Sequence, residues 1–361
     1  MAFSEKIIET RQKALALCKE YFARPDEIAE FNTLKILDAM RKVKVSEAHF
    51  NTTSGYAYDD IGRNKIEELY AEVFKAEAAL VRTQFVSGTH ALATVLFGIL
   101  RPGDQLIYIT GTPYDTMQTV IGYATDSPGS LKEFGILYDE VPLKDGRVDF
   151  DVAKEKITTK TKMVVIQRSC GYMMRPSLSV DEIGEICKFV KEINPNCICY
   201  VDNCYGEFTD TKEPIEVGAD IIAGSLIKNP GGGIAPTGGY IVGRKDLVEL
   251  ASYRMTSPGM GAELGASLAN NRLLFQGLFL APHVVAQAVK SAIFAAAFFD
   301  LLGFKTLPAP DTKRNDIIQA IEMGSKEKLV AFCQGIQKYS PVDSYACLLY
   351  TSPSPRDRQK S

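Results

Sequence analysis

The sequence is poor in the residues that usually bind metal ions. It has three histidines in 361 residues, His49, His90 and His283, and no two of them have the spacing of ligands on one helix. Its eight cysteines include no CxxC pair, and the cluster CICYVDNC (197–204) has no histidine nearby. We therefore expect no structural zinc site and interpret the cysteines as reduced residues of a cytosolic core.

A basic excess, a signal peptide and a long hydrophobic run are also missing. The formal net charge is −3, so nothing favours nucleic acid as a partner. The opening MAFSEKIIETRQ is charged within five residues and contains no apolar core of a signal peptide. The most apolar segment, SAIFAAAFFDLLGF (291–304), is too short to cross a bilayer and contains Asp300. We expect a cytoplasmic protein without a membrane segment.

The last residues differ in composition from the rest of the chain. Residues 347–361, CLLYTSPSPRDRQKS, are rich in serine, proline and arginine and show no periodicity. The stretch CLLYTSPSPRD resembles the in-frame translation of a sequencing adapter, and the alternative is a disordered terminus. We interpret the segment as a non-native tail and expect the natural sequence to be cut near Ala346.

What the sequence does contain is an alternation of short apolar runs and helical patterns. Seven runs have strand length: ALVRTQ, QLIYIT, ILYDEVPL, MVVIQ, CICYVD, DIIAGS and GGYIVG. Strands that alternate with helices predict an α/β fold with a mostly parallel seven-stranded sheet covered on both faces. The last run follows its predecessor without a crossover helix, so we expect it to be antiparallel. Ser179 and Glu182 form the pattern of a capping box before a helix.

The same patterns divide the chain into regions. We expect N-terminal helices and an arm over residues 1–55, a large cofactor-binding domain over 56–302, and the truncated start of a small C-terminal domain over 303–346. Within the large domain, residues 263–302 show a helical pattern.

Ligands of such sheets bind at the carboxyl ends of the strands, so the residues that follow each strand are the candidates for function. Ser87, Gly88 and Thr89 follow the first strand and open a helix, where free N–H groups and the helix dipole suit a phosphate. An ordinary helix cap has the same pattern. Neither GxxxxGK[ST] nor GxGxxG is present at this turn.

Three further strand ends carry polar residues. Asp202 ends a strongly apolar run, Lys228 follows another, and Tyr114 follows a third. Taken singly, each is more often a loop or cap residue. Together they match the needs of pyridoxal phosphate: an anion seat, a carboxylate for the pyridine nitrogen, an aromatic face and an amine that attaches the cofactor covalently. Ser225 can offer a hydroxyl to the same phosphate.

This interpretation carries two expectations about the lysine and its turn. We expect burial beside a cationic ring to lower the pKa of Lys228 and so to make its amine nucleophilic. We expect the three glycines that come after Asn229 and Pro230 to let the backbone pass close to the cofactor.

The motifs SLIKNPGGGIAPTGGYIVG, FVSGTHALA, VDNCYGEF and GYAYDDIGR resemble a bacterial family named for aluminium resistance or as methionine gamma-lyase-like. The resemblance runs from about residue 5 to Ala346. It implies the aspartate-aminotransferase superfamily fold (fold type I), pyridoxal 5'-phosphate as cofactor, and a homodimer or homotetramer with shared active sites. It also implies an amino-acid substrate and no nucleic-acid or membrane partner.

Carried over by residue, the resemblance makes Lys228 the Schiff-base lysine and Asp202 the partner of the pyridine nitrogen. Tyr114 matches the ring-stacking tyrosine, which in related lyases can also protonate the leaving group. Tyr56 matches a tyrosine that reaches the phosphate of the neighbouring subunit. The phosphate-binding turn and its hydroxyl correspond to Ser87, Gly88, Thr89 and Ser225.

Two departures from the family pattern stand out. Better-known gamma-lyases have an arginine two residues after the tyrosine of the arm, where this chain has Tyr58; either Arg63 replaces it or the cation is dispensed with. Those enzymes also bind the substrate carboxylate with an arginine late in the small domain. Between Arg272 and the tail this chain has only Arg314, which no motif marks, so we expect that arginine to lie beyond the cut.

The implied activity is a carbon–sulfur lyase reaction on a sulfur-containing amino acid, in the manner of methionine gamma-lyase. Fold and cofactor do not fix the reaction, so an aminotransferase and a catalytically silent cofactor-binding protein stay open. His90 stays open as well, between a place near the cofactor ring and a helix surface.

Overall fold

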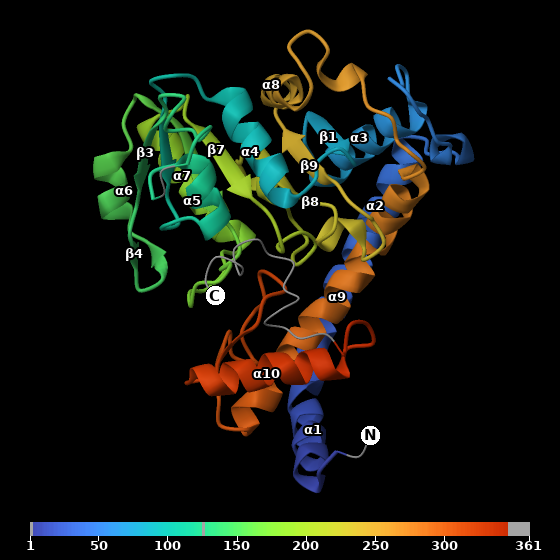
Figure 1. Ribbon diagram of the computed structural model, residues 1–361, viewed down its shortest axis with the longest axis vertical. Helices are drawn as coiled ribbons and strands as arrows, with labels where there is room; N and C mark the ends of the chain where they lie inside the picture. The colour runs from blue at the N-terminus through green and yellow to red at the C-terminus, as the bar shows by residue number, and fades with distance from the viewer. Residues whose placement is uncertain (1–2, 125–126, 346–361) are drawn as a thin grey trace.

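The computed structural model describes residues 3–124 and 127–345 and shows an α/β fold built on one seven-stranded sheet (Figure 1). The strands lie in the order β1-β9-β8-β7-β6-β2-β3. β9 pairs antiparallel with β1 and β8, and the other pairings in this sheet are parallel. The expected strands, including the antiparallel one, are confirmed. Their bounds are β1 Ala78–Arg82, β2 Gln105–Tyr108, β3 Leu137–Glu140, β6 Thr161–Gln167, β7 Ile198–Asp202, β8 Ile221–Ser225 and β9 Gly239–Gly243.

Helices cover both faces of the sheet. Side chains of a strand alternate between faces, so on β7 Cys199 and Val201 belong to one apolar cluster while Ile198 and Tyr200 belong to the other. The first cluster includes residues of α3, α7 and α9, and the second those of α4, α5 and α8. The helix bounds are α1 Glu5–Cys18, α2 Ala23–Lys42, α3 Ile61–Phe74, α4 Gly88–Ile99, α5 Asp115–Ile121, α6 Phe150–Lys156, α7 Val180–Ile193, α8 Lys245–Met255, α9 Asn271–Leu301 and α10 Lys326–Tyr339.

Local sequence accounts for several of these boundaries. The predicted capping box before α7 is present, since the Ser179 hydroxyl accepts from the Glu182 N–H and the Glu182 carboxylate accepts from the Ser179 N–H. Six of the described cysteines are buried, and the thiols of these six form no disulfide bond. The helix expected from residue 263 begins only at Asn271. Over 262–266 the carbonyls accept hydrogen bonds from the buried side chains of Arg63 and Arg82 and from the exposed side chain of Gln84 instead of from a helix.

Residues 303–345 form a separate group of elements at the far end of α9 (Figure 1). β10 (Lys305–Leu307) pairs antiparallel with β11 (Ala320–Glu322), and α10 follows. Two short strands, β4 (Leu143–Lys144) and β5 (Arg147–Val148), make a hairpin at the edge of the main fold. The boundary near residue 302 stays a prediction, and the predicted non-native tail, 347–361, lies outside the described residues.

α9 is long and apolar enough to cross a membrane by length and composition alone. The prediction that the apolar segment is too short was therefore wrong, because the helix extends twenty residues before Ser291, to Asn271. In this fold α9 is a core helix, since Leu274, Leu278, Val285 and Val289 belong to the apolar cluster shared with α2 and α3.

The turn after Lys228 packs directly against the backbone of α9. A Cβ on Gly232 would lie 2.3 Å from the carbonyl oxygen of Gly277, and a Cβ on Gly277 would lie 2.4 Å from the carbonyl oxygen of Gly231. Gly232 also has φ +56°, a conformation that side chains disfavour. None of the glycines 231–233 lines the cavity described below. For Gly231 and Gly232 the prediction of a close approach to the cofactor was wrong, because packing on α9 requires them.

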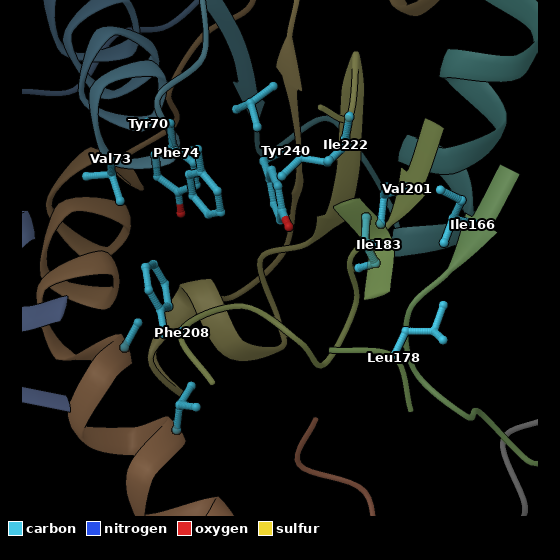
Figure 2. Packing of buried hydrophobic residues seen from close by; sticks show 14 of the residues in the cluster. Tyr70, Val73, Phe74, Ile166, Leu178, Ile183, Val201, Phe208, Ile222 and Tyr240 are labelled. Atoms are coloured by element: carbon cyan, nitrogen blue, oxygen red, sulfur yellow. The ribbon is translucent and has the colours of Figure 1, made fainter. Parts of the chain in front are cut away.

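A polar network lies buried behind the carboxyl ends of β6 and β7. The Tyr240 hydroxyl donates to Glu207 (2.7 Å), and Asn203 donates to Glu213 (3.1 Å) and accepts from Arg168 (2.8 Å). Figure 2 shows Tyr240 beside Tyr70 and Phe74, where the three rings pack with centroids 5.4–5.9 Å apart. Both carboxyl groups are fully buried; Glu213 forms an ion pair with Arg168, whereas burial raises the pKa of Glu207 to about 8.

We predict that Gly277→Ala destabilises the protein by about 1–3 kcal/mol, because the new methyl group collides with the turn that carries Lys228. Gly335→Ala is the matched control: it also lies in a helix, α10, but its Cβ would meet nothing within 4 Å. That variant should be neutral or up to about 1 kcal/mol more stable through helix propensity. Denaturant unfolding measures both, and equal effects would contradict the proposed contact.

We predict that Glu207 makes the protein less stable as pH rises from about 4.5 to about 8. In that range the unfolded carboxyl group is ionised while the folded one keeps its proton, so stability is full below the range and is lost through it, by at most about 1.4 kcal/mol per pH unit. Glu207→Gln should flatten the curve of unfolding free energy against pH. The exposed control Glu5→Gln should leave the curve unchanged. A curve for Glu207→Gln as steep as that of the wild type would refute the assignment.

Candidate active site

A cavity of about 330 Å³ opens at the carboxyl ends of the parallel strands. β7 and β8 are parallel neighbours, so the residues that follow them reach the same edge of the sheet. Of the eight predicted site residues, seven line this cavity and Tyr56 does not. The lining residues are Ser87, Gly88, Thr89, Tyr114, Asp115, Thr116, Gln167, Ser169, Gly171, Tyr172, Asp202, Cys204, Tyr205, Ser225, Ile227, Lys228 and Ile318.

One wall of the cavity is the N-terminus of α4. Ser87 caps this helix, and its hydroxyl accepts from the His90 N–H at 3.1 Å. The first N–H groups of a helix have no partner within it and attract anions. A Cβ on Gly88 would lie 3.1 Å from the Ser225 Cβ, so Ser225 stands directly beside this helix end. Ser225 is fully buried, and its hydroxyl has no hydrogen-bond partner among the described residues.

His90 contributes to this turn from outside the cavity. Its Nδ1 accepts from the Val86 N–H at 3.2 Å, and its ring packs edge-on against Phe85. The structure fits neither of the two places left open for His90, because the residue does not line the cavity and is half-buried against this turn.

Asp202 lies on the floor of the cavity. Its carboxylate accepts from the Cys204 N–H at 3.1 Å, and no side-chain ammonium or guanidinium group is within ion-pair distance in the described chain. Burial raises the pKa of Asp202, and Lys228 and the Cys204 N–H oppose that rise. A cationic group bound next to this carboxylate would compensate its burial.

Lys228 reaches into the cavity from the turn after β8. Its Nζ lies 3.9 Å from the centroid of the Tyr205 ring. Burial alone would lower its pKa, but the acidic groups of Cys204, Tyr205, Asp202 and Glu207 outweigh burial and raise it. The groups of the chain itself therefore do not lower the pKa of Lys228. The predicted lowering depends on the charge of a bound cationic ring.

Tyr114 lines the cavity from the start of α5. Burial raises the pKa of its hydroxyl, and the charge of Asp202 adds to the rise. The hydroxyl is therefore protonated at neutral pH and can serve as a hydrogen-bond donor.

Tyr56 lies outside this cavity and is 76% exposed. It belongs to the arm 51–60, which lies along residues 262–269: the Gly265 N–H donates to the Tyr56 carbonyl at 3.1 Å, and the Leu268 N–H donates to the Thr53 carbonyl. The predicted role of Tyr56 concerns a neighbouring subunit, so it stays a prediction.

Arg63, the possible substitute in the arm, and Arg314, which no motif marked, both bond groups outside this cavity. Arg63 donates to the carbonyls of Ala57, Gly265 and Glu263 and to the side chain of Asn64. Of the two alternatives for the missing arginine, these contacts favour the one in which the cation is dispensed with, because the N–H groups of Arg63 hold the arm in place. Arg314 lines a different cavity, between α2 and α9, and donates to Gln319 and Ala309.

Sequence reasoning missed several residues of the site. Cys204 and Tyr205 follow directly after β7, where the strand-end rule would have found them. Gln167 and Ser169 lie at the end of β6 and directly after it, where the same rule applies. Ile318 comes from the segment between β10 and β11, and no local signal could have placed it here.

The site fits pyridoxal phosphate on three observations. The unpartnered Ser225 hydroxyl stands at the helix end that suits a phosphate. The Asp202 carboxylate is buried without an ion-pair partner in the described chain, as the carboxylate that holds a pyridinium nitrogen would be. An amine, on Lys228, enters the same cavity.

Comparison with known proteins agrees with this interpretation. A sequence profile described as methionine gamma-lyase matches residues 7–357. The uncharacterized protein YnbB of Bacillus subtilis is 54% identical over 322 residues, which are 89% of this chain and 76% of YnbB. The crystal structure of a carbon-sulfur lyase involved in aluminium resistance from Clostridium novyi is similar with a TM-score of 0.92 at 49% identity, covering 95% of this chain and 82% of that one.

More distant relatives include the L-methionine gamma-lyase of Treponema denticola, 24% identical over 58% of this chain and 49% of that enzyme. The profile match includes residues 347–357, so it lends no support to a non-native tail, and that interpretation stays a prediction. The match over nearly the whole described chain shows the family directly. The chain belongs to the methionine gamma-lyase family, a family of pyridoxal-phosphate-dependent carbon–sulfur lyases with fold type I.

Proposed function

We propose that this protein binds pyridoxal 5'-phosphate in the cavity at the ends of β7 and β8 and eliminates a thiol from a sulfur-containing L-amino acid, as methionine gamma-lyases do. The observation that carries the proposal is the meeting of Lys228, Asp202 and the α4 N-terminus in one cavity. Ile227 and Ile318 line the same cavity and offer apolar surface to a thioether side chain.

Six groups of the cavity would hold the cofactor. The N–H groups of Gly88 and Thr89 and the hydroxyl of Ser225 would bind its phosphate, and the Asp202 carboxylate would bind its pyridine nitrogen. Tyr114 offers a ring face to the cofactor. Lys228 would be the residue that attaches it covalently.

Pyridoxal phosphate, when bound, supplies an aldehyde that joins amines and a ring that withdraws electrons from the α-carbon of an amino acid. Lys228 is the group placed to take the α-proton, since its amine lies in the cavity and becomes free when the substrate amine takes its place. Asp202 favours a protonated ring nitrogen by charge. The protonated Tyr114 hydroxyl can donate a proton to the departing sulfur.

We further propose a homodimer or homotetramer in which Tyr56 contributes to the site of a neighbouring copy. The exposure of Tyr56 and the anchoring of its backbone to Gly265 support this proposal. No arginine is among the described residues that line the cavity, so an arginine for the substrate carboxylate stays a prediction.

We predict that the protein supplied with pyridoxal phosphate converts L-methionine or a related thioether amino acid, with water, to a thiol, a 2-oxo acid and ammonia in equal amounts. No amino acceptor should be needed. The three products are measured colorimetrically, and Lys228→Ala, which lacks the amine, should reduce their formation by at least about a thousandfold. Turnover that requires a 2-oxo acid acceptor would instead indicate an aminotransferase.

We predict that Asp202→Asn separates cofactor binding from turnover. The amide keeps the shape of the carboxylate but loses its charge, so the ring nitrogen is no longer held protonated. Borohydride reduction followed by peptide mass spectrometry should still find a pyridoxyl group on Lys228. Product formation should fall by about a hundredfold or more. Loss of labelling and turnover in equal measure would argue against the role assigned to Asp202.

A further inference from the structure

The ring of Tyr205 lies against the amine of Lys228, with Nζ 3.9 Å from the ring centroid. An ammonium group within about 6 Å of an aromatic face is attracted by the ring, and more strongly where water is excluded. Both residues line the cavity. The contact therefore belongs to the site, although none of the predicted roles includes Tyr205.

The backbone of Tyr205 is in a conformation that large residues rarely adopt. Its φ is +71°, and Phe208, three residues later, has φ +61°. Such strain persists only where surrounding structure fixes it, and it is concentrated at functional sites. Here the left-handed turn lies between Asp202, at the end of β7, and the buried Glu207.

Buried hydrogen bonds fix this turn from both sides. The Asn203 side chain is held by Arg168, Glu213 and Tyr240. The Asn229 side chain, next to Lys228 in the chain, donates to the Glu207 carbonyl at 2.9 Å. The Ile317 N–H donates to the Tyr205 carbonyl at 3.3 Å. The turn that carries the ring and the turn that carries the amine are thus tied to each other.

We infer that Tyr205 is a positioning residue for Lys228: its ring face holds the lysine amine when that amine carries a proton, in the chain without cofactor and after the amine has taken the α-proton of a substrate. The inference rests on the proposed function in one respect: it takes Lys228 as the residue to which the cofactor is attached and from which it is released. Cys204, Asp202 and Glu207 are the other titratable groups that act on the amine, and all lie on β7 or in the turn after it.

The contact can be tested in the full chain freed of pyridoxal phosphate. Lysine amines are labelled with a trace of acetic anhydride at a series of pH values, and mass spectrometry compares Lys228 with the exposed Lys188 in the same molecule. Since only the neutral amine reacts, the pH midpoint of labelling reports how strongly the ammonium form is held. Tyr205→Phe keeps the ring and removes the hydroxyl, whereas Tyr205→Leu removes the ring.

We expect the Lys228 midpoint to fall by about one pH unit in Tyr205→Leu, so that labelling relative to Lys188 rises about tenfold below the midpoint. Tyr205→Phe keeps the ring but loses the acidic hydroxyl, so its midpoint should fall by less than half as much as that of Tyr205→Leu. Tyr205→Asn gives a second ring-free variant that tolerates a left-handed backbone and should fold even if the leucine variant does not. It should show the same shift.

An unchanged midpoint in both ring-free variants would overturn the inference. So would a rise in labelling by the same factor at every pH, which would mean easier access of the reagent rather than a weaker hold on the ammonium. In the enzyme loaded with cofactor, loss of the ring should lower kcat and spare KM. Because the labelling needs neither cofactor nor turnover, it can succeed even if the proposed lyase reaction fails.

Discussion

The burial of the Asp202 carboxylate is the constraint around which the site is built. A carboxylate at the end of an apolar strand loses its hydration, and the free energy of that loss must be compensated by positive charge or by hydrogen bonds. Among the described residues, Cys204 supplies hydrogen bonds from its backbone N–H and its thiol, and Lys228 supplies a more distant charge. A bound cation would supply the rest of the compensation. A protonated pyridine ring is the cation that also suits the phosphate-binding helix end and the amine of Lys228.

The position of Lys228 depends on packing far from the chemistry. Its turn packs against α9 through Gly231, Gly232 and Gly277. A Cβ atom at any of these glycines would collide with a backbone carbonyl oxygen, so no side chain fits there. α9 in turn is held by α2 and α3 through the larger apolar cluster. A long core helix therefore fixes the position of the turn from which Lys228 enters the cavity.

Buried charged side chains in this protein serve mainly to shape irregular backbone. Arg63 and Arg82 bind consecutive carbonyls of residues 262–265, and these carbonyls would otherwise be unsatisfied between η5 (Gly261–Glu263) and α9. The turn after β7 is held differently: Arg168 and Glu213 bond the Asn203 side chain, and the Glu213 carboxylate accepts from the Phe208 N–H. Guanidinium groups thus bond the backbone carbonyls of 262–265 directly, whereas after β7 buried side chains bond one another and the backbone, so the segments beside the site can be irregular and still fixed.

The order of residues alone was enough to predict the strands and seven of the seventeen residues that line the candidate site. Apolar runs bounded by polar residues predicted all seven strands, and the rule that ligands bind at strand ends pointed to Ser87, Tyr114, Asp202 and Lys228, because those signals are local. Three features were decided only by packing in three dimensions, because no local sequence pattern specifies them. Gly232 meets α9, Arg63 is saturated by carbonyls, and the ring of Tyr205 lies against Lys228. Each of these depends on a contact between segments distant in the sequence or on a backbone angle fixed by such contacts, and neither leaves a pattern in the order of the residues.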